Sequence, residues 1–279
     1  MMGKMMRMLA NRLRSARIAL LAAAAALLPG CGTGAADDPL TADAGWVRIP
    51  TQDTTTESVR ARFERPKGKG PFAAVLVIHP GGGVRGTPLD YGRRLREWGY
   101  AALVIDSYGS RNIRSTGDVG TRQGTRYQLA DLYGALSWLA QRPDIDMQRI
   151  AALGFSRGGQ TTLSAIAAEE SLPGYLRDGL RRPGKVALGV GIFASCIDVD
   201  DLRIEGKLLM LVGDRDRERN VECVGELTAK ARAAGFAAEA KVYPGARHDY
   251  TRRRDTDDER DAAADTLIRT REFLDRHLK

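Results

Sequence analysis

From residue 73 onward, the chain alternates short, largely apolar segments with longer segments of helical periodicity. A continuous apolar run is typical of a strand that is buried on both faces, as in parallel sheets covered by helices. Such runs predict strands at 73–80, 101–107, 149–156, 185–194, 207–214 and 238–245, after two shorter strand-like pieces at 46–49 and 58–66. Helical spacing covers 89–99, 125–143, 157–170, 221–235 and 258–279. The alternation predicts an α/β fold with a mostly parallel central sheet and helices on both faces.

The first part of the chain has the pattern of an export signal. A basic stretch precedes an eleven-residue apolar run from Ile18 to Leu28, which is too short to span a bilayer but suits a signal peptide. The following "LPGC" resembles a bacterial lipoprotein cleavage box, with Cys31 as the lipidated residue. Pro29 departs from the small residue usual there, so ordinary cleavage and release of a soluble protein is the alternative. We predict a signal peptide at 1–30, a flexible tether at 31–45 and one domain at 46–279.

Net charge and composition bear on the partners that we expect. The formal charge is +8, and the predicted signal peptide contributes five basic residues and no acid, so the remaining chain carries +3. No basic stripe interleaved with aromatic residues occurs either. We therefore expect no nucleic-acid partner, and a membrane contact only through a lipid anchor on Cys31. The expected location is the bacterial cell envelope, on the periplasmic side.

Ser156 lies at a strand-to-helix junction with small neighbours. The stretch "LGFSRGGQ" places Gly154 two residues before the serine and Gly158 two residues after it, at the end of one predicted strand and the start of a helix. This is the context of the G-x-S-x-G elbow, in which a sharp turn exposes a nucleophilic serine. A serine that merely caps the helix in a glycine-rich turn is the alternative interpretation.

A serine nucleophile needs a base, and the base needs an acid. Of the three histidines, His248 directly follows the last predicted strand, which would bring it to the same sheet edge as Ser156. The alternative is an exposed loop histidine. In the expected order of serine, acid and histidine, both Asp214 and Asp216 are candidates for the acid.

The developing negative charge on a substrate oxygen needs backbone donors. The amide of Arg157 follows the nucleophile, and a second donor is expected from "HPGGG" after the first buried strand. Pro80 has no N–H, so Gly81 is the candidate. No cofactor is expected, and three scattered histidines do not suggest a metal site.

These segments resemble the dienelactone hydrolase family of α/β-hydrolases. The resemblance runs from about residue 58 to 279 and rests on "AAVLVIHPGGG", "GYAALVIDSYGSRN", "RIAALGFSRGGQ", "LLMLVGDRDRE" and "KVYPGARHDY". It implies that the acid is Asp216, three residues after Gly213, and not Asp214. Founding members use a cysteine nucleophile where this chain has Ser156. They also have His-Gly where this chain has His79-Pro80, and a glutamate near the oxyanion hole that is missing here.

The resulting prediction is a serine hydrolase that cleaves a small-molecule carboxylic ester or lactone through an acyl-enzyme. Peptidase or amidase chemistry on the same three residues remains an alternative, because the leaving group is set by pocket shape. A non-catalytic envelope binding protein that keeps the fold is the other alternative.

Two further pairs of residues carry predictions. Arg111 and Arg114 lie in a polar loop at 108–124, after a strand end, and we predict that one of them lines the substrate entrance and favours anionic substrates; a solvated loop arginine is the alternative. Cys196 and Cys223 follow neighbouring strands, and many relatives in the family carry cysteines at matching places. In an oxidising compartment they are predicted to form a disulfide, with two buried free thiols as the alternative.

Overall fold

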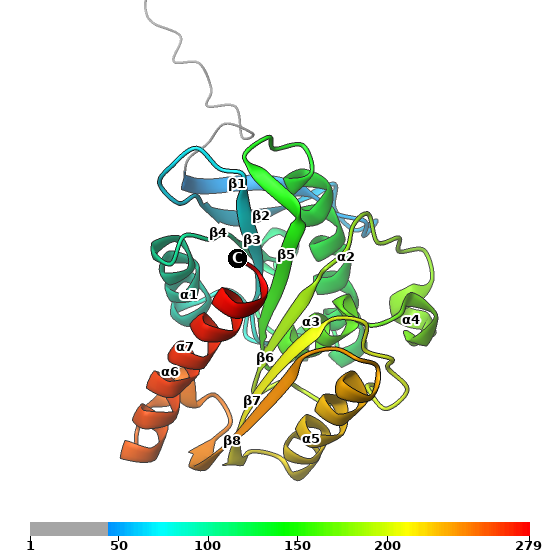
Figure 1. Ribbon diagram of the computed structural model, residues 1–279. Helices are drawn as coiled ribbons and strands as arrows, with labels where there is room; N and C mark the ends of the chain where they lie inside the picture. Colours follow the sequence, from blue (N-terminus) through cyan, green and yellow to red (C-terminus); the bar gives the residue numbers. More distant parts are fainter. Residues whose placement is uncertain (1–43) are drawn as a thin grey trace, which may run out of the picture. The chain divides into compact units, whose positions relative to one another are not determined.

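Eight strands form one sheet in the computed structural model, which describes residues 44–279 (Figure 1). Their order across the sheet is β1-β2-β4-β3-β5-β6-β7-β8. The pairs β1–β2 and β2–β4 are antiparallel, and every other neighbouring pair is parallel. The strands are β1 (Ala44–Pro50), β2 (Ser58–Glu64), β3 (Phe72–Ile78), β4 (Ala101–Asp106), β5 (Ile145–Phe155), β6 (Leu188–Ile192), β7 (Lys207–Arg215) and β8 (Ala238–Arg247).

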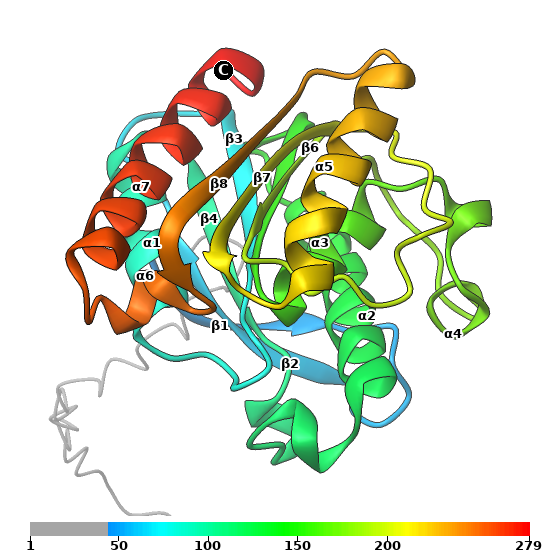
Figure 2. The same cartoon turned by 90° about the horizontal axis from the view of Figure 1, so that it is seen from below.

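Helices cover both faces of this sheet (Figures 1 and 2). Helices α2 (Thr121–Leu139), α3 (Arg157–Ala165) and α5 (Glu218–Ala233) pack on one face. Helices α1 (Gly86–Glu97) and α7 (Asp257–His277) pack on the other, with the short α6 (Tyr250–Arg253) beside α7. The predicted α/β-hydrolase architecture is confirmed.

The central strands explain why their sequences read as continuous apolar runs. In β3, Leu76 and Ile78 point into the core under α2, α3 and α5, whereas Val75 and Val77 point into the core under α1 and α7. All four side chains are fully buried. Because successive side chains of a strand face opposite sides, a strand between two helical layers needs apolar residues at every position.

Several element boundaries differ from the sequence-based prediction. Helix α3 ends at Ala165 and not at residue 170, because the chain turns to pair with the segment before β7: Ala167 bridges Ile204, and the Ala168 N–H donates to the Arg203 carbonyl at 2.8 Å. Strand β6 ends at Ile192, because Phe193 has a φ of 38° and turns the chain away from the sheet.

Two of the connections contain short helical turns. The polar loop after β4 holds the 3₁₀ turns η1 (Gly109–Arg111) and η2 (Thr116–Asp118), and α2 already begins at Thr121. The segment between α3 and β6 contains η3 (Glu169–Ser171) and α4 (Gly174–Arg177). The polar loop lies at the carboxyl edge of the sheet, where β3, β5, β7 and β8 also end.

Candidate active site

Ser156 lies between the end of β5 and the first residue of α3, in a strained backbone conformation. Its φ is 51° and its ψ is −110°, a region that residues with a side chain seldom adopt. A β-carbon at Gly154 would overlap the carbonyl of Gly158, and one at Gly158 would overlap the carbonyl of Ile78. The small flanking residues therefore let the elbow fit against the helix and the neighbouring strand, while Ser156 remains partly exposed.

The structure brings Ser156, His248 and Asp216 into one hydrogen-bonded chain. The distance from Ser156 Oγ to His248 Nε2 is 2.9 Å, and His248 Nδ1 lies 2.7 Å from Asp216 Oδ2. The three side chains come from the ends of β5, β8 and β7, which lie at the same edge of the sheet. About a third of the His248 side chain is exposed, whereas the Asp216 side chain is fully buried.

The surroundings of Asp216 keep it ionised. Burial by itself raises the pKa of this carboxyl, but interactions that favour the charged form outweigh the burial and lower the pKa below its usual range. The first of these is the contact with His248, followed by hydrogen bonds from the Asn220 side chain and the Arg217 N–H. A buried anion beside Nδ1 fixes the proton of the imidazole on that nitrogen and leaves Nε2 free to accept a proton.

Asp214, the other candidate, has a different partner. Its Oδ1 accepts the Gly245 N–H at 2.8 Å, and the residue is exposed. Asp214 therefore braces β7 against β8 across a register shift of their pairing. The side chain of Asp216, two residues further along the chain, is buried and contacts His248.

The two predicted oxyanion donors lie close to each other, beside Ser156. Arg157 is the first residue of α3, so its N–H has no acceptor within the helix. Gly81 lines the same cavity as Ser156, and its carbonyl is held by the Thr116 N–H of η2 at 2.7 Å. A β-carbon at Gly81 would lie 4.0 Å from that of Arg157. Their role as donors remains a prediction.

His79 supports the loop that carries Gly81. It is fully buried, and its Nδ1 lies 2.7 Å from the Pro80 carbonyl oxygen. The Gln128 side chain donates to the His79 carbonyl at 2.8 Å, and Gln128 in turn accepts from Thr161 of α3. Burial is the largest influence on His79 and lowers its pKa, so the imidazole is neutral at pH 7.

Arg111 does not lie where the sequence suggested. Its side chain is 4% exposed, and its guanidinium donates to both oxygens of Asp131 on α2, each at 2.9 Å. It also donates to the Ser107 carbonyl at 2.6 Å and stacks on the Tyr127 ring at 4.5 Å. The prediction that Arg111 lines the substrate entrance is wrong, because this arginine ties the loop after β4 to α2.

Arg114 does not line the cavity at Ser156 either. Its side chain is 90% exposed and lies 3.8 Å from Asp118, a geometry typical of a solvated surface pair. The arginines that do line this cavity are Arg85 and Arg252. Arg252 follows His248 by four residues, within α6, and Arg85 directly precedes α1. Neither belonged to a motif that the sequence analysis used.

The cavity at Ser156 has a volume of about 400 Å³ and mixes apolar and polar groups. Phe155 and Phe193 form its apolar wall, and the Phe193 ring packs edge-on against His248 with 5.1 Å between the ring centres. Each phenylalanine is the last residue but one of a predicted strand, at the edge where sites form in open α/β sheets. This place near the ends of predicted strands was the sequence signal that could have identified the two phenylalanines as site residues.

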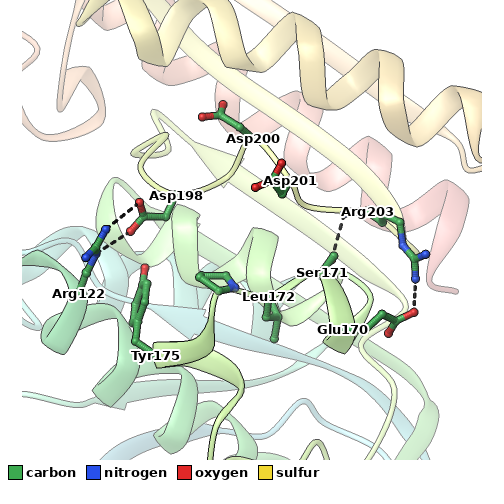
Figure 3. A pocket seen from close by; sticks show the side chains of 10 residues that line it. Arg122, Glu170, Ser171, Leu172, Tyr175, Asp198, Asp200, Asp201 and Arg203 are labelled. Carbon is green, nitrogen blue, oxygen red and sulfur yellow. Dashed lines mark hydrogen bonds and ion pairs between the residues drawn. The ribbon is translucent and has the colours of Figure 1, made fainter.

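A larger cavity of about 760 Å³ lies away from Ser156, between α4, the start of α2 and the segment before β7 (Figure 3). Its charged groups are largely paired with one another, as Arg122 is with Asp198 at 3.0 Å and Arg203 with Glu170. This cavity contains none of Ser156, Asp216 or His248, so it lies apart from the candidate active site.

Cys196 and Cys223 are joined by a disulfide, with their α-carbons 6.3 Å apart. The bond connects the segment after β6 to α5, and the loop that it closes contains Asp216. Cys31, the predicted signal peptide and almost all of the predicted tether lie outside the described residues.

Residues 44–279 contain no group of three histidine, cysteine, aspartate or glutamate side chains placed to hold a metal ion. In that same part of the chain, no helix is both long and apolar enough to cross a membrane.

Comparison with known proteins identifies the family. The model of the dienelactone hydrolase family matches residues 59–278. The chain belongs to this family. A protein of Escherichia coli (strain K12) that is provisionally named carboxymethylenebutenolidase is 29% identical over 218 residues, which cover 74% of this chain and 77% of the relative.

Solved structures of similar proteins support the same fold. A thermophilic esterase from Thermogutta terrifontis superposes with a TM-score of 0.62 at 17% identity, covering 84% of this chain and 94% of the esterase. A dienelactone hydrolase-like promiscuous phosphotriesterase from metagenomic libraries gives a TM-score of 0.62 at 19% identity, covering 85% of this chain and 100% of the phosphotriesterase. These neighbours show the fold, and membership of the dienelactone hydrolase family supports hydrolase activity on a small-molecule substrate.

Proposed function

We propose that this member of the dienelactone hydrolase family is a serine hydrolase that cleaves carboxylic esters or lactones through an acyl-enzyme. The observation that carries the proposal is the chain from Ser156 Oγ through His248 to the buried, ionised Asp216, with links of 2.9 and 2.7 Å. In this arrangement the imidazole removes the serine proton, and the carboxylate stabilises the imidazolium that forms.

The proposed reaction has two steps. His248 Nε2 takes the proton of Ser156 Oγ while this oxygen attacks the substrate carbonyl carbon, and the amides of Gly81 and Arg157 donate to the oxyanion. The intermediate collapses, His248 returns the proton to the departing alkoxide, and an acyl-serine remains. A water molecule then gives a proton to His248 as its oxygen attacks the acyl carbon. This second intermediate collapses to release the acid, and His248 returns the proton to Ser156 Oγ. With a lactone, the alcohol and the acid are parts of one product.

The cavity favours a small acyl or alcohol group. A volume of about 400 Å³ lies within the range of small-molecule sites, and the Phe155 and Phe193 wall suits an apolar portion of the substrate. Arg85 and Arg252 line the same cavity, and Arg252 is paired with Asp249 at 2.6 Å, so Arg85 in particular replaces Arg111 and Arg114 as the side chain that would favour anionic substrates.

We also propose that the protein is exported and anchored by a lipid on Cys31 in the bacterial cell envelope. The support is the signal-like sequence before Cys31 and the disulfide between Cys196 and Cys223, since disulfides persist in oxidising compartments.

A series of p-nitrophenyl esters of increasing acyl length tests the activity and the size of the site. The proposal expects turnover of short esters and a fall in kcat/KM once the acyl group exceeds the cavity. The Ser156→Ala variant should lose roughly 10³-fold or more in kcat. Turnover by this variant at the wild-type rate would overturn the assignment of the nucleophile.

A further inference from the structure

The oxygen of Asp216 that faces away from His248 also receives hydrogen bonds. Oδ1 accepts from the Asn220 side chain at 2.9 Å and from the Arg217 N–H at 2.6 Å, while Oδ2 faces His248. Asn220 lies in the first turn of α5 and is 4% exposed. The carboxylate is thus held on both oxygens, and the side-chain donor on Oδ1 comes from Asn220.

The other end of the Asn220 amide is held as well. Its Oδ1 accepts the Cys196 N–H at 3.1 Å, just after β6. Because a backbone N–H can only donate and the ionised Asp216 can only accept, these two partners fix which end of the amide carries the oxygen. Aspartate, leucine and alanine each lack one or both of the required groups at this position.

These contacts close a ring that begins and ends at the proposed nucleophile. The Ser195 N–H donates to the Ser156 carbonyl at 2.9 Å, and the next residue, Cys196, donates to Asn220. Asn220 donates to Asp216, which bonds His248, which bonds Ser156 Oγ. The segment after β6 therefore supports both the elbow and, through Asn220, the acid.

We propose that Asn220 is a positioning residue that holds the Asp216 carboxylate in the orientation in which it binds His248; this rests on the proposed function above. Without Asn220, Oδ1 would keep only the N–H of Arg217, the next residue of the same loop, and the carboxylate could tilt about its last side-chain bond. The Asn220 donor, which comes from α5, removes that freedom and favours the ionised form. Asn220 touches neither the substrate nor the reacting atoms, so its effect passes through Asp216.

Two substitutions separate this role from simple support of α5. Asn220→Leu has a similar shape and removes both hydrogen bonds. We expect kcat for a short p-nitrophenyl ester to fall roughly 10- to 100-fold, the range of a hydrogen bond to a charged group, with KM changed by about twofold or less. Asn220→Asp is isosteric and keeps the acceptor for the Cys196 N–H, so it removes only the donor to Asp216.

The Asn220→Asp variant gives a pH signature. When protonated, the new carboxyl can donate to Asp216 and replace the lost amide donor. When ionised, it cannot donate and it repels the Asp216 carboxylate. Burial and that repulsion raise its pKa, so we expect the ratio of variant to wild-type kcat to fall roughly tenfold or more as the pH rises from about 5.5 to about 8.5. If Asn220 only anchored the Cys196 N–H, this ratio would not change with pH.

A spectroscopic measurement tests the positioning without substrate. The proton between His248 Nδ1 and Asp216 Oδ2 should give a low-field proton resonance in the wild-type protein, assigned by its loss in His248→Ala. We expect Asn220→Leu to broaden or shift this resonance. Glu222→Gln is the matched control on the same helix, since Glu222 is exposed and makes only a 3.8 Å pair with Arg219.

The outcomes are distinct. Loss of kcat in Asn220→Leu, the pH-dependent ratio in Asn220→Asp and a perturbed resonance support the proposal. An unchanged resonance in a folded Asn220→Leu variant, or a ratio that is constant with pH, overturns it. If Asn220→Leu does not fold, the isosteric Asn220→Asp variant decides through the same resonance at high pH. If the wild-type protein cleaves no ester, the proposed function fails, while the resonance still decides the role of Asn220.

Discussion

Two aspartates lie two residues apart at the end of β7, and their contacts predict effects of very different size for the same substitution. Asp216 bonds His248 Nδ1 at 2.7 Å, whereas Asp214 bonds the Gly245 N–H. Asp216→Asn should lower kcat roughly 10³- to 10⁴-fold, because an amide cannot hold the imidazole in the required tautomer. Asp214→Asn keeps an oxygen for Gly245, so kcat should stay within about twofold of wild type. Steady-state kinetics on one p-nitrophenyl ester compares them, and a larger loss in Asp214→Asn would contradict the assignment.

Arg111 illustrates a residue whose importance is structural. Arg111→Ala should lower the free energy of unfolding by about 3 kcal/mol or more, because it leaves the fully buried Asp131 without its charged partner. The ratio of kcat/KM between a carboxylated and a neutral ester should not change. Denaturant unfolding measures the loss of stability, and kcat/KM for the carboxylated and for the neutral ester gives the ratio. Arg114→Ala is the control, expected to leave stability within about 0.5 kcal/mol. A changed ester ratio in Arg111→Ala would restore Arg111 as a substrate contact.

At the scale of secondary-structure elements, the end of β8 is attached to the start of α7. Arg247, directly before His248, binds both oxygens of Glu259 at 2.7 and 3.0 Å, and the Glu259 side chain is fully buried. Thr256 caps the helix by accepting the Glu259 N–H. The hydrogen bond from Arg247 is the largest cause that lowers the pKa of Glu259 to about 2.

This attachment predicts a pH-dependent stability. A carboxyl whose pKa is lower in the folded than in the unfolded state stabilises the fold above its unfolded pKa, and this contribution is lost as the pH falls towards the folded pKa. The difference in Tm between wild type and Glu259→Gln should therefore be complete at pH 6 and shrink as the pH falls from about 4.5 towards 2. Thermal unfolding across this range measures it. A difference that is the same at every pH would show that the charge of Glu259 is not involved.

The disulfide joins α5 to the segment after β6, close to the acid. The two cysteines are 27 residues apart, and closing such a loop gives about 3.5 kcal/mol on the chain-entropy model. Because Cys223 follows Asn220 by three residues on α5, reduction should loosen the support of Asp216 and lower kcat at reductant concentrations that leave the far-ultraviolet circular dichroism unchanged. Alkylation in denaturant without reductant should leave Cys196 and Cys223 unmodified. Alkyl groups on both would mean that no disulfide forms.

At the scale of the whole molecule, local sequence pattern predicted the sheet, the two helical layers, Ser156 and His248 of the proposed triad, whereas the choice of Asp216 over Asp214 came from the family resemblance. The end of each strand and the order of residues along the chain can be read from the sequence, and a parallel sheet places the carboxyl ends of its strands at one edge. The partners of Arg111 were not predictable in this way, because Asp131 is twenty residues further on and meets it only after α2 packs on the sheet. Asn220 was missed for the same reason, since its partners come from two other segments.

The central claim is that Ser156 is a nucleophile, and mapping a fluorophosphonate adduct tests it most directly. Tryptic cleavage after Arg149 and Arg157 releases residues 150–157, in which Ser156 is the only hydroxyl side chain. The account predicts one adduct per chain, on this peptide, with none in Ser156→Ala and much slower labelling in His248→Ala. An unlabelled wild-type protein, or an adduct on a different peptide that persists in Ser156→Ala, would contradict it.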